Sequence, residues 1–448
     1  MIGQGMNILF IFGTGSEVRQ FLHSGIISQL VKLGNIVFIS AKLSIADEAR
    51  KVDVSVIELP WYDPTYASSY LSRISKLLDL AFEHKYKYKE WRYDNRIKKK
   101  NANSFLIQIA TYGPIYYFLI AFERFLQESG KFISKSWLNL LLYNNIDKVV
   151  TNAARNYPLV FFAAQKLKIP TVILFHTNKD IYAQGRLFFH FKKYGVWNQE
   201  MANELMSYNS FIKKQDIEVI GCAHFSYLAK NEQTMRSFQI SNTLNIDNKR
   251  NFLILYTAAD PRVILNEILY VKDICESIEM SGISNYRIFV RTNPMDFSND
   301  WESIKNDKVF VLRPKWFYDP KAHFNYTMYE DLEEFSSLLK LCHVCINIPS
   351  TVTVECAITN LPVINICYNN ESNKGCDILK FWNALFYKNV IKYGAAIPAH
   401  SKHELRAHLE NIANGHHIYD NQKLYLNSEL GVDVNNMTEN SCRFILMD

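Results

Sequence analysis

The stretch "INIPSTVTVECAITNLPVINI", Ile346 to Ile366, decides the fold class that the sequence predicts. It begins and ends with short apolar runs rich in β-branched residues, which are typical of buried strands. Between these runs lie a Pro-Ser-Thr corner and a segment that we interpret as a helix. A strand, a helix and a second strand in this order form a parallel βαβ unit, in which the corner follows the carboxyl end of the first strand.

The same alternation extends over most of the 448 residues and predicts an α/β chain. We expect two tandem Rossmann-like domains, an N-terminal one over residues 1–240 and a C-terminal one over residues 241–448 with a C-terminal tail. A ligand is then expected in a cleft between the domains, at the carboxyl ends of their strands. The predicted strands are "NILFIFG", "NIVFIS", "VSVIELP", "DKVVTN", "TVILFH", "KYGVWN" and "IEVIG" in the first half, and "NFLILYTA", "YRIFVR", "KVFVL", "VCINI" and "PVINICYN" in the second.

Residues 66–135 interrupt this alternation and predict a helical insertion in the first domain. Apolar residues from Leu71 to Phe82 recur at helical spacing. The basic window 85–100 follows, with eight Lys or Arg against two acidic residues. The apolar stretch 105–122 comes next, and a Gly-Pro break interrupts it, so we expect a buried or interfacial helix pair here and not a transmembrane span.

Composition restricts the class of protein. A hydrophobic content of 48% with ordinary charge indicates a soluble globular chain. The basic window accounts for the whole net charge of +6, whereas a nucleic-acid-binding protein spreads basic residues over a broad face, so no nucleic acid is expected. Cys342 and Cys345 have CxxC spacing, but no second pair completes a metal site. The cysteines and the absence of a signal-peptide pattern predict a cytoplasmic protein.

The first half offers five candidate site residues, each with a structural alternative. The loop "GTGSEV" lacks the third glycine of a dinucleotide fingerprint, which argues against NAD or FAD and favours a turn for close packing. Glu17, Arg19 and His23 follow on a helix that faces either the cleft or solvent. His176 ends a predicted strand and Asp180 follows it, so they serve either a ligand or the structure of the turn.

The second half offers a candidate phosphate site at the Pro-Ser-Thr corner. A helix that starts at Ser350 or Thr351 presents free N–H groups and two hydroxyls to an anion. Glu355 lies four residues after Thr351, on the same helix face, where it suits a ribose. The alternative is that Ser350 only caps the helix and Glu355 is a solvated acid. Arg291 ends a predicted strand and favours the phosphate interpretation.

The order "VRTNPMD", "LLKLCHVCINIPSTVTVECAITNLPVINI" and "GAAIPAHSKHELRAHL" resembles the nucleotide-binding domain of GT-B glycosyltransferases. It is most similar to the bacterial surface-polysaccharide group that includes CDP-glycerol glycerophosphotransferases and sialyl- and Kdo-type transferases. In the first half, "FGTGSEVRQFLHSGIISQLVKLG" and "VWNQEMANELMSYNSFIKKQDIEVIGCAHFSYL" also resemble this group. Asn293 stands where the group usually has histidine.

The resemblance implies metal-independent transfer, in which the protein itself stabilises the departing nucleotide. It implies no cofactor beyond the nucleotide-sugar substrate. Glu17 is the first candidate for the catalytic base and His23 the second. We assign Arg19, His176 and Asp180 to the acceptor side or the cleft. The implied donor-binding residues are Thr257, Arg262, Arg291, Asn293, Ser350, Thr351 and Glu355.

The favoured hypothesis is a transferase of polysaccharide biosynthesis in the cell envelope. It moves a sugar from a nucleotide-sugar to a surface-glycan, lipid-linked or glycoprotein acceptor. Residues 85–100 are expected either to bind an anionic membrane surface, which would make the protein peripheral on the inner face of the cell membrane, or to form a solvated helix. Two alternatives stay open: a sugar-nucleotide 2-epimerase or CDP-glycerol-type phosphotransferase on the same fold, and a non-catalytic scaffold that binds nucleotide-sugar.

Overall fold

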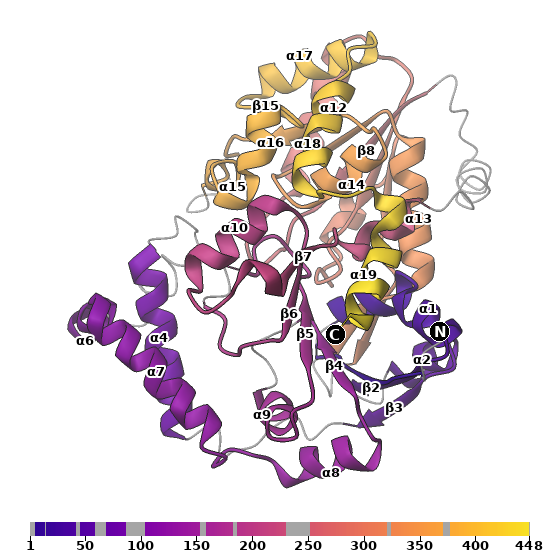
Figure 1. Ribbon diagram of the computed structural model, residues 1–448. Coiled ribbons are helices and arrows are strands. Elements are labelled where there is room, and N and C mark those ends of the chain that lie inside the picture. The colour runs from indigo at the N-terminus through magenta and orange to yellow at the C-terminus, as the bar shows by residue number, and fades with distance from the viewer. Residues whose placement is uncertain are drawn as a thin grey trace. The chain divides into compact units, whose positions relative to one another are not determined.

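The computed structural model describes residues 5–13, 15–41, 45–58, 69–86, 104–152, 158–181, 186–229, 251–319, 324–370 and 377–447. The chain contains two large parallel sheets with helices around them, which confirms the predicted α/β class (Figure 1). It divides into two compact units. The first consists of Met1–His224, Tyr318–Tyr326 and Leu430–Asp448, and the second of Phe225–Phe317 and Thr327–Glu429.

The first unit contains a seven-stranded sheet in the order β3-β2-β1-β4-β5-β6-β7, and its neighbouring strands are parallel. The order 3-2-1-4-5-6 is that of the Rossmann fold, and it reverses between β1 and β4. All seven strands predicted in this half are present. They are β1 (Asn7–Ile11), β2 (Ile36–Ala41), β3 (Ser55–Glu58), β4 (Lys148–Thr151), β5 (Thr171–Leu174), β6 (Lys193–Val196) and β7 (Ile217–Val219).

The second unit contains a six-stranded parallel sheet in the order β10-β9-β8-β13-β14-β15, which repeats the same topology. Its strands are β8 (Phe252–Thr257), β9 (Tyr286–Arg291), β10 (Val309–Leu312), β13 (Val344–Asn347), β14 (Val363–Ile366) and β15 (Ile397–Ala399). The short β15 was not predicted. A separate two-stranded sheet of β11 (Trp316–Asp319) and β12 (Phe324–Thr327) was not predicted either.

The helices connect these strands as parallel topology requires. In the first unit they are η1 (Val18–His23), α1 (Ile26–Lys32), α2 (Ala46–Arg50), α4 (Tyr70–Tyr86), α6 (Ser104–Thr111), α7 (Gly113–Glu128), α8 (Lys135–Tyr143), α9 (Pro158–Lys166), α10 (Gln199–Tyr208) and α19 (Met437–Leu446). In the second unit they are α12 (Ile268–Met280), α13 (Tyr329–Leu341), α14 (Val352–Ile358), α15 (Leu379–Trp382), α16 (Lys388–Tyr393), α17 (Lys402–Ala413) and α18 (Tyr419–Glu429).

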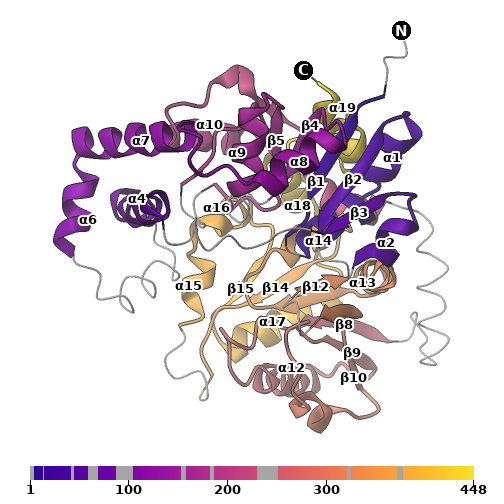
Figure 2. The same cartoon turned by 90° about the horizontal axis from the view of Figure 1, so that it is seen from below.

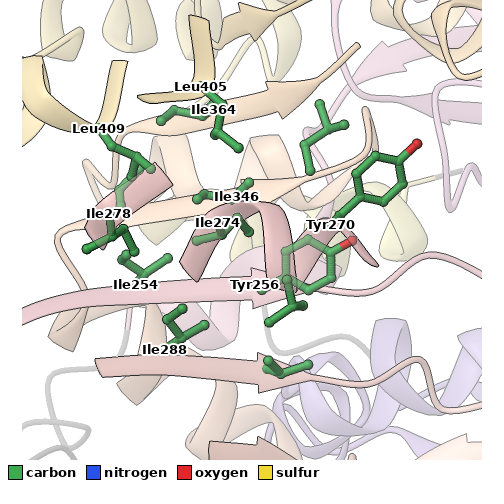
Figure 3. Close-up of a cluster of buried hydrophobic side chains, with 14 of the residues drawn as sticks. Ile254, Tyr256, Tyr270, Ile274, Ile278, Ile288, Ile346, Ile364, Leu405 and Leu409 are labelled. Atoms are coloured by element: carbon green, nitrogen blue, oxygen red, sulfur yellow. The ribbon is translucent and has the colours of Figure 1, made fainter. Parts of the chain in front are cut away.

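One face of the second sheet forms a core with α12 and α17 (Figure 3). Ile254 and Ile346 of adjacent strands meet Ile274 of α12 and Leu405 of α17, and all four are fully buried. Burying one such side chain contributes about 1.5–3 kcal/mol. Because the alternate residues of each strand fill this face, the polar residues at the last strand positions lie on the opposite face.

The predicted helical insertion is present as α4, α6 and α7, which pack against one another (Figure 2). As predicted, α6 ends before the Gly-Pro pair and α7 starts at Gly113. The buried guanidinium of Arg186 pairs with Glu123 of α7 and lies 3.5 Å from Asp79 of α4, so it joins the insertion to the rest of the first unit. No helix in the described ranges is long and apolar enough to cross a membrane. Most of the predicted basic window, 87–100, lies outside the described residues.

The C-terminal helix differs from its predicted placement, because α19 packs in the first unit and not in the second. Its Cys442 thiol donates to the carbonyl of Ile26 in α1 at 3.6 Å, and the Lys148 ammonium of β4 donates to the carbonyl of Ile445 at 2.8 Å. The structure therefore assigns Leu430–Asp448 to the first unit, together with Met1–His224. The predicted boundary at residue 240 lies outside the described ranges.

Candidate functional site

The first candidate group surrounds η1, a π-helical turn that follows β1. Its Gln20 side chain donates to the carbonyl of Leu174 at the end of β5 (3.2 Å) and accepts from the Asn152 amide after β4 (2.8 Å). One side chain thus links the ends of three neighbouring parts of the sheet, β1, β4 and β5. Single π-turns occur preferentially at functional sites, because they redirect side chains. The switch point of the sheet lies here, between β1 and β4.

Gly15, between β1 and η1, packs closely against another chain segment. A Cβ atom at Gly15 would lie 1.8 Å from the carbonyl oxygen of Asn325. Only glycine permits this approach. Gly15 therefore allows a close approach, but to Asn325 of β12 and not between the strand and the following helix, as the close-packing interpretation of the "GTG" loop expected.

Two of the predicted residues on η1 are buried, so the alternative of a solvated helix face is wrong for them. Glu17 has no exposed surface, and its carboxylate accepts from the Ser16 hydroxyl at 3.4 Å. His23, at the end of η1, is 7% exposed. Arg19 is partly buried on the same turn. A catalytic role for Glu17 or His23 stays a prediction.

Two histidines meet at the same edge of the sheet. The Nδ1 atoms of His176, after β5, and His224, after β7, lie 3.3 Å apart, and the ring centres are 4.7 Å apart. Burial and, to a smaller extent, the nearby positive charge of Arg19 lower the pKa of His176 to about 3. Burial, Arg19 and His176 also lower the pKa of His224. Both rings are therefore neutral at neutral pH, and one Nδ1–H donates to the other Nδ1.

The loop behind His176 is rigidly bonded. Asp180 accepts from the backbone N–H of His176 at 3.2 Å and from both the N–H and the hydroxyl of Thr177 at 2.9 Å. The Cys222 thiol donates to the carbonyl of His176 at 3.6 Å, and the Trp197 indole donates to that of Phe175 at 3.0 Å. Asp180 therefore closes the turn that positions His176.

Sequence reasoning missed His224. It lies in "GCAHF", five residues after the end of β7, whose carboxyl end belongs to the same edge as that of β5. The signal was its position after a predicted strand, the criterion that selected His176.

In the second unit, four polar residues form one row across four adjacent strands. Thr257 of β8 is in register with Arg291 of β9 and with Asn347 of β13, and Asn347 is in register with Asn365 of β14. Each lies at or next to the end of its strand. Residues in register in a parallel sheet project to the same face. The row therefore places a guanidinium, a hydroxyl and two amides together at the switch point between β8 and β13.

Two residues of this row, together with Thr292 directly after β9, have buried atoms without hydrogen-bond partners in the described chain. The Nη1 of Arg291 and the hydroxyls of Thr257 and Thr292 are buried and make no hydrogen bond within the described residues. The Nη2 of Arg291 donates to Asp331 of α13 at 2.7 Å, and the guanidinium lies 4.5 Å from the ring of Phe335. Buried polar atoms in proteins nearly always have a partner. Three such atoms at one strand edge therefore indicate a hydrogen-bonding ligand.

A chain of buried hydrogen bonds holds the Pro-Ser-Thr corner in place. The Asn347 amide donates to the Ser350 hydroxyl at 3.2 Å, and the Asn365 amide donates to the Asn347 oxygen at 2.5 Å. The Tyr387 hydroxyl continues the chain from Asn365 to Thr353 of α14, at 2.6 Å from each. The Ser350 hydroxyl also accepts the N–H of Val352, the first residue of α14, at 3.4 Å. The corner is therefore fixed before any ligand binds.

The two other predicted residues of the corner behave differently. Thr351 is exposed and occupies the N-cap position of α14 without a capping hydrogen bond. Glu355 is 4% exposed, so the alternative of a solvated acid is wrong. Its carboxylate accepts from the hydroxyl of Tyr227 at 2.9 Å, a contact that the sequence did not predict. The contact of Glu355 with a ribose stays a prediction.

Arg262 and Asn293 bond within their own turns. The exposed Arg262 guanidinium pairs with Asp260, with Nε 2.9 Å from Oδ1, and the Asn293 oxygen accepts the N–H of Met295 at 2.9 Å. Sequence reasoning did not select Glu267, which accepts from the N–H of Ala259 at 2.9 Å just after β8. Burial raises the pKa of Glu267 to about 7.

Comparison with known proteins shows the fold. No protein-family model and no curated protein sequence matches the chain. Among solved structures, it is similar to the UDP-GlcNAc 2-epimerase of Neisseria meningitidis bound to UDP-GlcNAc, with 13% identity, a TM-score of 0.55, and coverage of 99% of this chain and 100% of that one. The chain is also similar to the UDP-GlcNAc 2-epimerase of Methanocaldococcus jannaschii, with 15% identity, a TM-score of 0.55, and coverage of 97% of this chain and 98% of that one. It is similar as well to a glycosyltransferase from Rickettsia africae, with 11% identity, a TM-score of 0.53, and coverage of 98% of each chain. The chain thus has a two-domain GT-B-type fold.

Proposed function

We propose that the protein is a nucleotide-sugar-dependent GT-B enzyme that transfers a sugar to an acceptor hydroxyl. The observation that carries this proposal is the set of three buried polar atoms without partners at the ends of β8 and β9: Arg291 Nη1, Thr257 Oγ1 and Thr292 Oγ1. A guanidinium and two hydroxyls are donors, and a nucleotide phosphate offers acceptor oxygens. The solved relative from Neisseria, with the same fold, is bound to UDP-GlcNAc.

The second unit would stabilise the leaving nucleotide. As the sugar–phosphate bond breaks, negative charge grows on the phosphate oxygens, and fixed donors stabilise that charge without reorganising. The pair with Asp331 holds Arg291 in place, while the bonded chain through Asn347 and Asn365 holds Ser350. In this proposal the transfer needs no metal ion and no cofactor.

The first unit would supply the base that takes the proton of the acceptor hydroxyl. Glu17 is the first candidate and His23 the second, and the neutral rings of His176 and His224 lie at the same sheet edge. Burial, with a smaller contribution from Arg19, lowers the pKa of both rings, which makes them weak bases at neutral pH, so neither ring is assigned the role of the base. We expect Glu17→Gln to remove turnover and leave nucleotide binding intact.

A second candidate function is 2-epimerisation of a nucleotide-sugar. Two of the epimerase structures resemble nearly the whole chain, with TM-scores of 0.55. Product analysis separates the two reactions. Transfer releases the nucleotide and requires an acceptor, whereas epimerisation leaves the nucleotide-sugar intact with an inverted carbon. A non-catalytic scaffold would bind the donor tightly and change it in neither way.

The phosphate site is tested by calorimetric titration with UDP, GDP, CMP and CDP. Thr257→Val replaces an unbonded buried hydroxyl with a methyl group of similar size. We expect it to weaken binding of the correct nucleotide at least about tenfold, while stability stays unchanged or rises by about 1 kcal/mol. The matched control is Ser277→Ala in α12, whose buried hydroxyl donates to the carbonyl of Asp273 at 2.7 Å. It should lower stability by about 1 kcal/mol and leave the affinity unchanged. Full affinity in Thr257→Val would refute the site.

The acceptor and the cellular location complete the proposal. We propose a surface-glycan, lipid-linked or glycoprotein acceptor and a cytoplasmic protein on the inner face of the membrane. Incubating the enzyme with a labelled donor and each acceptor class identifies the acceptor, because only the correct class becomes labelled.

A further inference from the structure

Helix α7 presents an aromatic face to solvent. Tyr112, just before the helix, and Ile115, Phe118, Phe122 and Phe125 on it are spaced by three or four residues, so they lie along one side. Their exposed fractions range from 37% for Ile115 to 68% for Phe118. A surface helix normally turns such a row toward the core. In α7 the row has no protein partner within the described residues.

The opposite side of α7 explains this orientation. Glu123 and Gln127 are buried there, with 1% and 9% of their surfaces exposed. Glu123 pairs with the buried Arg186, and the Gln127 amide donates to the carbonyl of Phe188 at 3.0 Å. These bonds fix the rotation of the helix. The polar side faces the protein and the aromatic side faces outward, which is the reverse of the usual arrangement.

A cavity of about 920 Å³ lies beside α7. Tyr117 and Phe125, both more than half exposed, line it, so it adjoins the aromatic face. Thr171, the first residue of β5, also lines it. The cavity therefore lies at the amino-terminal edge of the first sheet, whereas His176 lies at the carboxyl-terminal edge. It is distinct from the candidate site described above.

The walls of this cavity combine rings with positive charge. Its cations are Arg124, Lys168, Arg186, Lys192 and Lys213, and its acids are Glu123, Glu128 and Asp216. Because Glu123 is paired with Arg186, four cations face two acids. Arg124 lies 4.1 Å over the ring of Phe211, and its Nη2 is buried without a hydrogen bond to any described residue. An oriented guanidinium with an open donor suits a phosphate oxygen.

A further cation lies at α7, away from the aromatic row. The Lys85 ammonium lies 4.6 Å from the ring centre of Tyr116 and 5.1 Å from that of Tyr117, and both of these tyrosines line the cavity. A second copy of the chain on this face would bring like charges together. An anionic lipid surface offers an apolar interior to the rings and negative headgroups to the cations.

We propose that the α7 face docks on an anionic lipid surface and that the adjoining cavity takes the phosphate headgroup of one lipid, with Arg124 as its partner. The aromatic row enters the boundary between headgroups and acyl chains, while the cavity cations stay at headgroup level. The inference rests on the membrane location in the proposed function and names the face and the headgroup that would carry it, while docking at this face holds equally for transfer and for epimerisation.

Co-sedimentation with phosphatidylcholine vesicles, with and without phosphatidylglycerol, tests the proposal on the full chain. We expect binding to the anionic vesicles only, and a loss of at least about tenfold in Phe118→Ser/Phe122→Ser/Phe125→Ser. The matched control, Leu142→Ser/Met280→Ser/Leu424→Ser, removes apolar side chains with exposed fractions of 58%, 63% and 56% elsewhere. It should bind like the wild type. Because all six side chains are exposed, both triple variants should keep the melting curve of the wild type, and this measurement checks that they fold.

Two further measurements make the test decisive. Arg124→Gln should reduce the preference for anionic over neutral vesicles, and free glycerol 3-phosphate should not displace the wild type. Equal binding of the aromatic triple variant and the wild type would overturn the proposal. So would a wild type that self-associates without vesicles and becomes monomeric in the triple variant, because the face would then be an interface between copies.

Discussion

The carboxyl-terminal edges of the two sheets share a topology and differ in chemistry. At the first edge, Gln20 joins η1 to two strands and His176 contacts His224, while the Oδ1 of Asn152 is buried without a hydrogen bond to any described residue. At the second edge, Thr257 and Arg291 keep buried donors without partners in the described chain. The two edges therefore differ in the kind of buried atom that a ligand would satisfy, an amide oxygen at the first edge and guanidinium and hydroxyl donors at the second.

The different side chains at the two edges indicate that the two units, which share a strand order, have different chemical roles. Duplicated strand order places a switch point in each unit, but the residues that follow each strand decide what the edge can do. A buried carboxylate at the first edge is suited to proton transfer. Donors at the second edge are suited to holding an anion. Three substitutions test this contrast, in order of expected effect.

The largest effect is expected from Arg291→Ala. Removing the guanidinium leaves Asp331, which is 1% exposed, as an uncompensated buried charge. We expect the free energy of unfolding to fall by about 3–5 kcal/mol, measured by urea denaturation. The matched control is Arg262→Ala in the same unit, whose pair with Asp260 is exposed and should contribute less than about 1 kcal/mol. Equal effects would show that Arg291 is not held by a buried ion pair.

The histidine pair predicts acid sensitivity of the first edge. Because the folded protein holds the pKa of His176 near 3, the folded state binds fewer protons than the unfolded state between pH 3 and 6.5. The free energy of unfolding should therefore fall as the pH is lowered through this window, by about 2–4 kcal/mol for this partly exposed ring. His176→Gln should flatten the curve, while His417→Gln, at an exposed position, should leave it unchanged. A wild-type slope that persists in His176→Gln would contradict the assignment.

The buried carboxyl of Glu267, at the second edge, predicts a smaller change of stability with pH, in the opposite direction to that of His176. Its pKa is raised to about 7, so between pH 4.5 and 7 the folded state binds more protons than the unfolded state. Stability should fall as the pH rises through this window, by up to about 3 kcal/mol. The difference between wild type and Glu267→Gln in urea denaturation at each pH isolates this contribution. A difference that does not vary with pH would show that Glu267 keeps its ordinary pKa.

Much of the fold could be predicted because it depends on local signals. Buried parallel strands read as short β-branched runs, and twelve of them were placed correctly. A helix cap is a local signal of the same kind: the Asn198 side chain precedes α10 and accepts the N–H of Met201 at 2.7 Å. The three-residue β15 carries too short a pattern to be recognised. The packing of α19 on α1 joins residues more than 400 positions apart, for which no local signal exists.

The candidate site was predicted only in part for the same reason. Sequence position selected His176 and Arg291 as strand-end residues, and this placement is confirmed. The partners of these residues, His224 and Asp331, lie 48 and 40 positions away in the chain. Spacing along the sequence gave no means of pairing them.

The sequence by itself determined the alternation of strands and helices, the helical insertion and the Pro-Ser-Thr corner, because periodicity, caps and turns act over a few residues. Tertiary structure alone decided the chemistry of the corner. It buried Glu355 against Tyr227, set Ser350 on a hydrogen-bonded chain from Asn365, and left the hydroxyl of Thr257 without a partner in the described chain. Burial and partnership depend on which distant strands lie side by side, and that arrangement is a property of the whole fold.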